Sequence, residues 1–243
     1  MNPLDNPFWH ALTGPQRPYS RSGGQAARYE PQFAPMAGLE ANTPAAWADL
    51  TTLTPPGDTV ALFGPTLLDA PAGWTRVGQG DPIQMVQLQA QAPLPTPAGF
   101  TVRPLGEADV PAILALVQLT RPGPFRPQTV ELGLYLGLWD ERHPDGPLLA
   151  AMTGERARLE GAREISAVCT HPDYRRQGLA RTLVSQVAAH TRAAGQRPFL
   201  HVNRDNTAAQ ATYASLGFEA REQLWVSVMR RDEAAEGGLH SQA

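Results

Sequence analysis

Lysine is absent from the 243-residue chain, in which all 20 basic residues are arginine. A Walker loop ends in Gly-Lys-Ser or Gly-Lys-Thr, so this type of phosphate site is excluded. Cysteine occurs once, at Cys169. One cysteine can form neither an intramolecular disulfide nor a cysteine-based zinc cluster, and we expect no metal site.

A large charge imbalance and long apolar runs are also missing. The formal net charge is −3 and no arginine-rich run occurs, which argues against binding nucleic acid through bulk electrostatics. No apolar stretch approaches the length that spans a bilayer, and the first residues lack the basic and apolar regions of a signal peptide. We therefore expect a soluble, cytoplasmic protein of bacterial type, with no membrane or nucleic-acid partner.

Proline is unevenly distributed, because 15 of the 24 prolines fall within the first 97 residues. Residues 92–98 are predicted to form a stiff, extended connector, since each proline fixes φ and removes a hydrogen-bond donor. We place a domain boundary there, between an N-terminal region of residues 1–95 and a second domain of residues 99–231. The polar tail, residues 232–243, is expected to be disordered.

Both parts of the chain show alternating strand and helix patterns. In the N-terminal region the sequence predicts a helix at residues 44–53 and strands at 59–63 and 83–86. The second domain is predicted to be a mixed sheet with helices on its faces. Its expected strands are 100–103, 148–155, 165–170, 199–202 and 223–229, and its expected helices are one capped by Asp109, one at 129–137, and two that begin near Gly178 and at Asn206.

The most informative segment follows the strand predicted at residues 165–170. A proline-containing turn leads into Arg175-Arg176-Gln177-Gly178-Leu179-Ala180, and an apolar stripe at Leu179, Leu183 and Val187 predicts that a helix begins near Gly178. The first N–H groups of a helix have no partner within it, and the helix dipole places partial positive charge there. Because glycine lets phosphate oxygens approach the main chain, this turn predicts a site for a pyrophosphate-bearing ligand.

A second block lies about thirty residues further along. Asn206 is a good N-cap for a helix that carries Ala209, Tyr213 and Leu216, and Gly217 suits the left-handed position that ends such a helix before Phe218.

Together the two blocks resemble the GNAT superfamily, the acyl-CoA-dependent N-acetyltransferases. Residues 175–180 match its Arg/Gln-x-x-Gly-x-Gly/Ala segment, residues 206–218 match its asparagine and tyrosine–leucine-glycine-phenylalanine block, and the resemblance covers residues 99–231. It implies an α/β, GNAT-like acyl-CoA N-acyltransferase fold with a mixed sheet. The smaller α/β N-terminal region is then either a degenerate GNAT-like half or a structural domain that shapes the substrate site.

The resemblance also assigns donor-binding residues. In GNAT folds, pantetheine inserts like a strand beside backbone groups that here belong to Val168, Cys169 and Thr170. Cys169 is expected to be a small apolar neighbour of the ligand, not a nucleophile. The pyrophosphate is expected at the turn, and Asn206 has either a coenzyme-binding role or a capping role alone. The remaining predicted coenzyme contacts are Arg175, Arg176, Gln177, Gly178, Leu179 and Ala180.

Two residues are the candidates for catalysis. Tyr213 stands where many GNAT enzymes place a tyrosine that protonates the departing thiolate, although an aromatic residue on the inner face of a helix has the same pattern. Glu164 stands where some members carry a glutamate base, although a surface carboxylate at the strand edge fits almost equally well. The weaker candidates for the base are His201, Glu131 and Glu155. The loop at 120–127 corresponds to the acceptor-lining segment, where Arg121 and Arg126 are candidates to bind an acidic group.

The sequence thus predicts an N-acetyltransferase that moves the acetyl group of acetyl-CoA directly to a primary amine of a small molecule or peptide. The alternative is a catalytically silent acyl-CoA-binding module that regulates a partner. The resemblance also allows a homodimer, for which the residues contain no separate signal.

Overall fold

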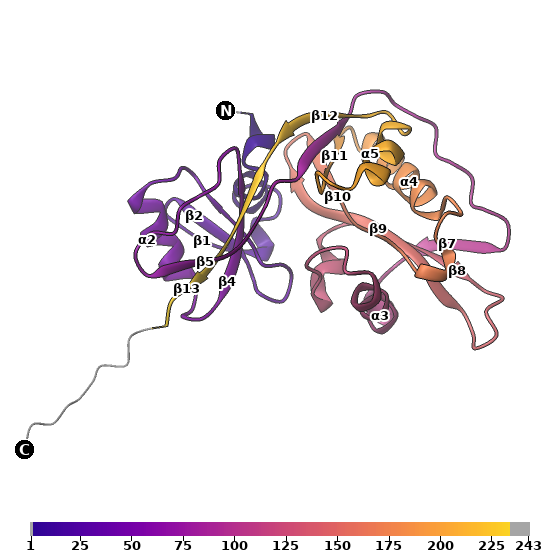
Figure 1. Ribbon diagram of the computed structural model, residues 1–243, viewed down its shortest axis with the longest axis horizontal. Coiled ribbons are helices and arrows are strands. Elements are labelled where there is room, and N and C mark those ends of the chain that lie inside the picture. The colour runs from indigo at the N-terminus through magenta and orange to yellow at the C-terminus, as the bar shows by residue number, and fades with distance from the viewer. Residues whose placement is uncertain (1, 234–243) are drawn as a thin grey trace, which may run out of the picture.

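The computed structural model describes residues 2–233, which form two sheets surrounded by helices (Figure 1). One sheet has six strands in the order β1 (Ser20–Gly23), β2 (Ala26–Tyr29), β3 (Met36–Leu39), β4 (Thr59–Gly64), β13 (Trp225–Arg231) and β5 (Trp74–Gly80). The other has seven, in the order β12 (Phe218–Gln223), β6 (Ile83–Gln87), β11 (Arg197–Val202), β10 (Ala162–Thr170), β9 (Leu148–Leu159), β8 (Tyr135–Asp140) and β7 (Phe100–Pro104). Residues 234–243 of the predicted tail lie outside the described residues.

The α-helices are α1 (Pro7–Thr13), α2 (Pro44–Leu53), α3 (Val110–Thr120), α4 (Leu179–Ala193) and α5 (Thr207–Ala214). Short 3₁₀ turns span Pro3–Asp5, Arg17–Tyr19, Glu107–Asp109, Pro127–Leu132 and Pro172–Tyr174. Helices α4 and α5 cover one face of the seven-stranded sheet, and α3 lies on the other (Figure 1). None of the helices within residues 2–233 is long and apolar enough to cross a membrane. This is the mixed α/β architecture that the sequence predicts.

Helix α4 begins where the sequence predicts it. Gly178 is its N-cap at φ 78°, a left-handed conformation that glycine adopts without strain. The predicted stripe of Leu179, Leu183 and Val187 is fully buried against the sheet. Gly195, at φ 70°, follows the helix and lets the chain turn into β11.

The two sheets exchange strands across the predicted domain boundary. Strand β6, from the N-terminal region, lies between β11 and β12 of the seven-stranded sheet. Strand β13, near the end of the chain, lies between β4 and β5 of the six-stranded sheet. The yellow β12–β13 segment and the purple segment that leads into β6 run between the sheets in opposite directions (Figure 1). They meet where the Leu224 N–H donates to the Pro82 carbonyl at 3.0 Å.

The same topology occurs in both halves, namely the N-terminal half up to β6 and the C-terminal half from β7. Strands β2, β3, β4, β13 and β5 are neighbours in the same order and with the same directions as β9, β10, β11, β6 and β12. In each set only the second and third strands are parallel, namely β3 with β4 and β10 with β11. Helices α2 and α4 make the corresponding connections. The chain therefore contains a repeated fold whose last strands are exchanged.

A common core joins the two halves. Helix α1 contacts both β3 and β9. Buried side chains from both halves form one apolar cluster, which includes Phe8, Tyr29, Met36, Leu159 and Phe199. The proline-rich connector also packs on the C-terminal half, because the Leu94 N–H donates to Ser185 Oγ on α4 at 2.9 Å. Hydrogen bonds and packing thus cross the boundary at residues 95–99 that we predicted from composition, and the division into domains stays a prediction.

Two predicted elements are wrong. The helix expected at residues 129–137 is a 3₁₀ turn that ends at Leu132, after which Gly133 is extended and β8 begins at Tyr135. Pairing of β8 with both β7 and β9 outweighs its local preference. The last strand, expected at 223–229 in the mixed sheet of the second domain, spans Trp225–Arg231 and belongs to the other sheet. Sequence periodicity identifies a strand but not its partner.

Candidate active site

Strands β10 and β11 separate halfway along their length. Their parallel pairing ends at Ile165 and Leu200, after which β10 continues with β9 and β11 continues with β6. A bulge marks the separation, because the β10–β9 register shifts between Ser166 and Cys169, and Ala167 adopts φ 53°. Past the bulge, the β11 side of β10 has no strand partner among residues 2–233. An extended ligand can form backbone hydrogen bonds there.

The turn before α4 leads away from this opening. Residues 175–178 are exposed, and Arg176 and Gly178 both have positive φ, at 64° and 78°. The first amide of α4 with an intrahelical partner is Thr182, which donates to the Gly178 carbonyl at 2.9 Å. The preceding N–H groups of the helix are free to bind an anion. No atom lies within 4 Å of a Cβ built on Gly178, so the space in front of the turn is open.

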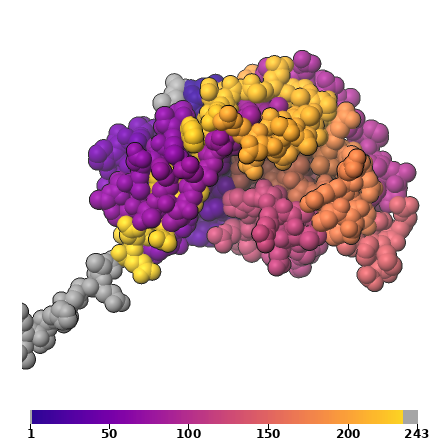
Figure 2. Space-filling model, in the orientation of Figure 1, coloured from indigo at the N-terminus to yellow at the C-terminus, as the bar shows by residue number. Residues whose placement is uncertain are grey.

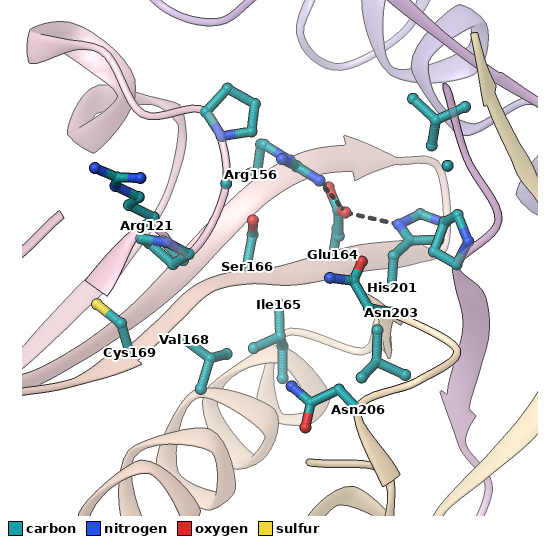
Figure 3. Close-up of a pocket in the computed structure, with 18 of the residues that line it drawn as sticks. Arg121, Arg156, Glu164, Ile165, Ser166, Val168, Cys169, His201, Asn203 and Asn206 are labelled. Atoms are coloured by element: carbon teal, nitrogen blue, oxygen red, sulfur yellow. Dashed lines mark hydrogen bonds and ion pairs between the residues drawn. The ribbon is translucent and has the colours of Figure 1, made fainter. Parts of the chain in front are cut away.

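A cavity of about 560 Å³ extends from the separated strands to the six-stranded sheet. Figure 3 shows Val168, Cys169 and Asn206 on its lower and left sides, and Glu164 between Arg156 and His201. The far wall consists of Met36, Ala61, Phe63, Gln79, Gly80 and Pro82 from the N-terminal half, together with Val226 and Val228 from the exchanged strand β13. Figure 2 shows the purple surface of one half against the pink and orange surface of the other. The cavity therefore belongs to both halves.

The structure brings many of the predicted site residues together. Both candidates for catalysis, Tyr213 and Glu164, line the cavity, and so do the predicted coenzyme contacts Val168, Cys169, Thr170, Arg175 and Asn206. The other predicted contacts, Arg176, Gln177, Gly178, Leu179 and Ala180, lie in the turn and first helical residues beside it. Arg121 lines the cavity, but neither Arg126 nor Glu131 is among its lining residues. Glu155 lies elsewhere, buried in an ion pair with Arg163.

Glu164 is a buried carboxylate with three hydrogen-bond donors. Arg156 binds it in a bidentate manner, from Nε to Oε2 at 2.9 Å and from Nη2 to Oε1 at 2.6 Å. His201 Nδ1 lies 2.8 Å from Oε1, and the dashed lines in Figure 3 mark these contacts from opposite sides. Burial favours the neutral acid, but the charge of Arg156 and the bond from His201 outweigh it and hold the pKa of Glu164 at about 2. Glu164 is therefore ionised at neutral pH and only weakly basic.

The proton of His201 is placed by Gln84, on the exchanged strand β6. Arg221 donates to Gln84 Oε1 at 2.9 Å, and Gln84 Nε2 donates to the Leu4 carbonyl at 2.9 Å, so both ends of the amide are assigned. The second N–H of Nε2 then points at His201 Nε2, 3.1 Å away. Because that ring nitrogen accepts, the ring proton lies on Nδ1 and is donated to Glu164.

Tyr213 and Cys169 are the other titratable groups near the point where the strands separate. Burial raises the pKa of Tyr213 to about 12, so its phenol keeps its proton at neutral pH. Burial also raises the pKa of Cys169 to about 11, so this thiol is a poor nucleophile. The structure contains no group of three or more metal-ligating side chains among residues 2–233.

Sequence reasoning missed two parts of this site. Arg156 lies eight residues before Glu164, and the tight turn at residues 160–161 makes them neighbours on adjacent strands. The opposite charges of Arg156 and Glu164, on either side of the turn, could have indicated this pair. The far wall carries no such signal, because most of its residues lie on β3, β4, β5 and β13, which are separated in the sequence and become neighbours only in the folded sheet.

The family model described as FR47-like protein matches residues 135–226. A protein of Novosphingobium aromaticivorans assigned to the GNAT family of acetyltransferases is 34% identical, and the match covers 96% of this chain and 100% of that one with a TM-score of 0.84. A GCN5-related N-acetyltransferase of Kribbella flavida shares the fold at 17% identity, over 88% and 90% of the two chains, with a TM-score of 0.58. A tandem GNAT protein of the clavulanic acid biosynthesis pathway shares it at 18% identity, over 89% and 82%, with a TM-score of 0.53. A search of curated protein sequences found no match.

Proposed function

This chain belongs to the GNAT family of acyltransferases, and on that premise we propose that it transfers the acetyl group of acetyl-CoA directly to a primary amine of a small molecule or peptide. The observation that carries the proposal is the single cavity that joins the unpaired edge of β10 to Tyr213 and Glu164. Donor, acid and acceptor position then lie in one continuous cavity.

The exposed turn at residues 175–178 would hold the donor pyrophosphate. Free N–H groups at the start of α4 supply hydrogen bonds and partial positive charge, and Arg175 and Arg176 add full positive charge nearby. The pantetheine amides would bind the free backbone groups of Val168–Thr170 as an added strand. These contacts depend on main-chain position, which is why Cys169 needs no chemical role.

Tyr213 would protonate the leaving thiolate. The amine nitrogen attacks the thioester carbonyl carbon, the carbon–sulfur bond breaks, and the sulfur takes the phenolic proton. The proton that the new amide nitrogen releases restores the phenol, so the reaction yields the N-acetyl amine and a free thiol. A phenol with a pKa of about 12 is fully protonated at neutral pH and can act as this acid.

Glu164 would bind the amine that attacks. With a pKa of about 2 it is a poor acceptor of a complete proton, but its full negative charge favours the positive charge that develops on the attacking nitrogen. Arg156 and His201 occupy three of its hydrogen-bonding positions and fix its orientation, so a further lone pair on Oε2 can serve the amine. We therefore assign Glu164 to amine binding and charge stabilisation.

Calorimetric titration with acetyl-CoA tests the proposal, and we expect binding in the micromolar range. Gly178→Glu places a negative charge at the turn and should abolish binding. Gly161→Glu is a matched control, because Gly161 has φ 76° against 78° for Gly178 and neither has an atom within 4 Å of a built Cβ. Both substitutions then carry the same backbone strain, about 1–2 kcal/mol. Full affinity in Gly178→Glu, or equal loss in both variants, would contradict the pyrophosphate site.

A further inference from the structure

The acceptor side of the cavity has an apolar wall, which consists of Met36, Ala61, Phe63, Val226 and Val228. These residues form rows across the sheet, since Val226 pairs with Phe63, and Ala61 pairs with both Val228 and Met36. Residues directly opposite one another in neighbouring strands point to the same face. The wall is therefore one continuous sheet face directed into the cavity.

Small residues keep this wall open. On the next strand, Gly80 pairs with Val226 and Gly78 pairs with Val228, so the rows continue without side chains. A Cβ built on Gly80 would meet only Val226 and Pro82, at 3.8 Å or more. The sheet therefore offers a shallow apolar surface beside which a flat or branched group fits.

The wall adjoins the position proposed for the amine. The rings of Phe63 and His201 have centroids 5.2 Å apart, and His201 contacts Glu164 directly. An amine held at Glu164 therefore has the apolar wall as its neighbour on the His201 side. In Figure 3, Cys169 and Arg121 lie on the opposite side of the view from His201. The donor side and the wall are thus at different ends of the cavity.

The charged side chains of the cavity lie outside the apolar wall. The charged residues that line it are Arg121, Arg156, Glu164 and Arg175. Arg156 and Glu164 form an ion pair, Arg175 belongs to the turn, and Arg121 lies on the side of the cavity opposite His201 (Figure 3). The wall itself has no charged residue. A second charged group on the acceptor would lose its hydration there without gaining a partner.

We propose that the acceptor is a primary amine whose remaining part is an uncharged aromatic or branched aliphatic group, bound against the wall that the six-stranded sheet supplies. This inference rests on the proposed function and adds the substrate class. It also gives the degenerate half a role, because β4 and the exchanged β13 contribute most of the wall.

The test compares 2-phenylethylamine with spermidine and glycine as acceptors in an assay of thiol release from acetyl-CoA. We expect kcat/KM to be at least tenfold higher for 2-phenylethylamine. Val226→Asn should lower that value at least tenfold and leave the KM for acetyl-CoA unchanged. Val77→Asn is the matched control, because Val77 is 47% exposed and does not line the cavity, and it should change neither value.

Val226→Ala adds no polar group and replaces Val226→Asn in the test if that variant does not fold. We expect Val226→Ala to lower kcat/KM for 2-phenylethylamine threefold to tenfold. The inference is overturned if spermidine or glycine is the better acceptor, if 2-phenylethylamine is neither acetylated nor bound at millimolar concentration, or if Val226→Asn acts like Val77→Asn. It is also overturned if Val226→Asn impairs benzoyl-CoA as a donor and leaves the amine unaffected, since the wall would then hold the acyl group. Absence of acetyl-CoA binding in the titration would instead remove the proposed function itself.

Discussion

Replacing Arg156 with methionine removes the cation that keeps Glu164 ionised inside the protein. Both side chains are buried, with residue exposures of 8% for Arg156 and 1% for Glu164. Methionine retains much of the apolar contact of the arginine stem but donates no hydrogen bond. Only the His201 donor then remains for the carboxylate. We expect Arg156→Met to raise the pKa of Glu164 above its ordinary value of 4.5, because burial is the largest influence on it and favours the neutral acid.

Arg156→Met loses stability because the buried Glu164 must then take up a proton. Neutralising a carboxyl group of pKa 4.5 at pH 7 requires about 3 kcal/mol, at 1.36 kcal/mol for each pH unit. This figure is at the lower end of the roughly 3–5 kcal/mol that breaking one side of a buried ion pair costs. Arg156→Met should therefore lower the free energy of unfolding by about 3 kcal/mol at pH 7.

The stability contributed by Glu164 changes with pH in opposite directions in the wild type and in Arg156→Met. In the wild type the folded pKa of about 2 lies below the unfolded value, so the contribution of Glu164 is present above pH 4.5 and is lost as the pH falls towards 2. In Arg156→Met the folded pKa is raised, so the folded state holds a proton that the unfolded state has released. Its stability should then fall as the pH rises from 5.5 to 7.5, with a slope of at most about 1.4 kcal/mol per pH unit.

Urea unfolding at pH 5.5, 6.5 and 7.5 measures both effects, and the double variant Arg156→Met/Glu164→Gln is the control. The double variant has no buried acid, so we expect it to recover much of the lost stability at pH 7.5 and to lack the additional slope. Equal stabilities and equal slopes for the single and double variants would refute the reasoning, because Arg156 would then have no role in keeping Glu164 ionised.

Three further outcomes are expected. Tyr213→Phe should lower kcat by about 10²-fold or more, as removal of a general acid does, with the KM for acetyl-CoA unchanged; a kcat within twofold of wild type would exclude the assigned role. Gln84→Glu places an acceptor against His201 Nε2 and should give this imidazole a second proton, visible in its ¹⁵N chemical shifts; a ring with one proton would mean that residue 84 does not contact Nε2 in solution. Residues 1–95 and 99–243 expressed separately should be insoluble and should form a soluble complex when co-expressed, since each sheet takes an internal strand from the other part; two soluble monomers would show that the exchange is dispensable.

Features that depend on neighbours along the chain could be predicted from the residues alone. Gly178, the stripe from Leu179 to Val187, and the Asn206 cap are local signals, and the structure places the helices where these residues predict them. The hairpin turn at 160–161 is equally local, and it places Glu164 opposite β9 and in the lining of the cavity. Such signals act through backbone conformation and helix capping, which need no knowledge of the distant fold.

The partners of each strand and the surroundings of each site residue depend on how the chain packs in space. The pattern at 223–229 indicates a strand, but period-two alternation does not specify the sheet that receives it. Here β13 lies in the six-stranded sheet and β6 in the seven-stranded sheet. The low basicity of Glu164 likewise depends on Arg156, His201 and Gln84, which come from three different strands. A pKa responds to charge and burial within a few ångströms, and that distance is set by packing in space, not by separation along the chain.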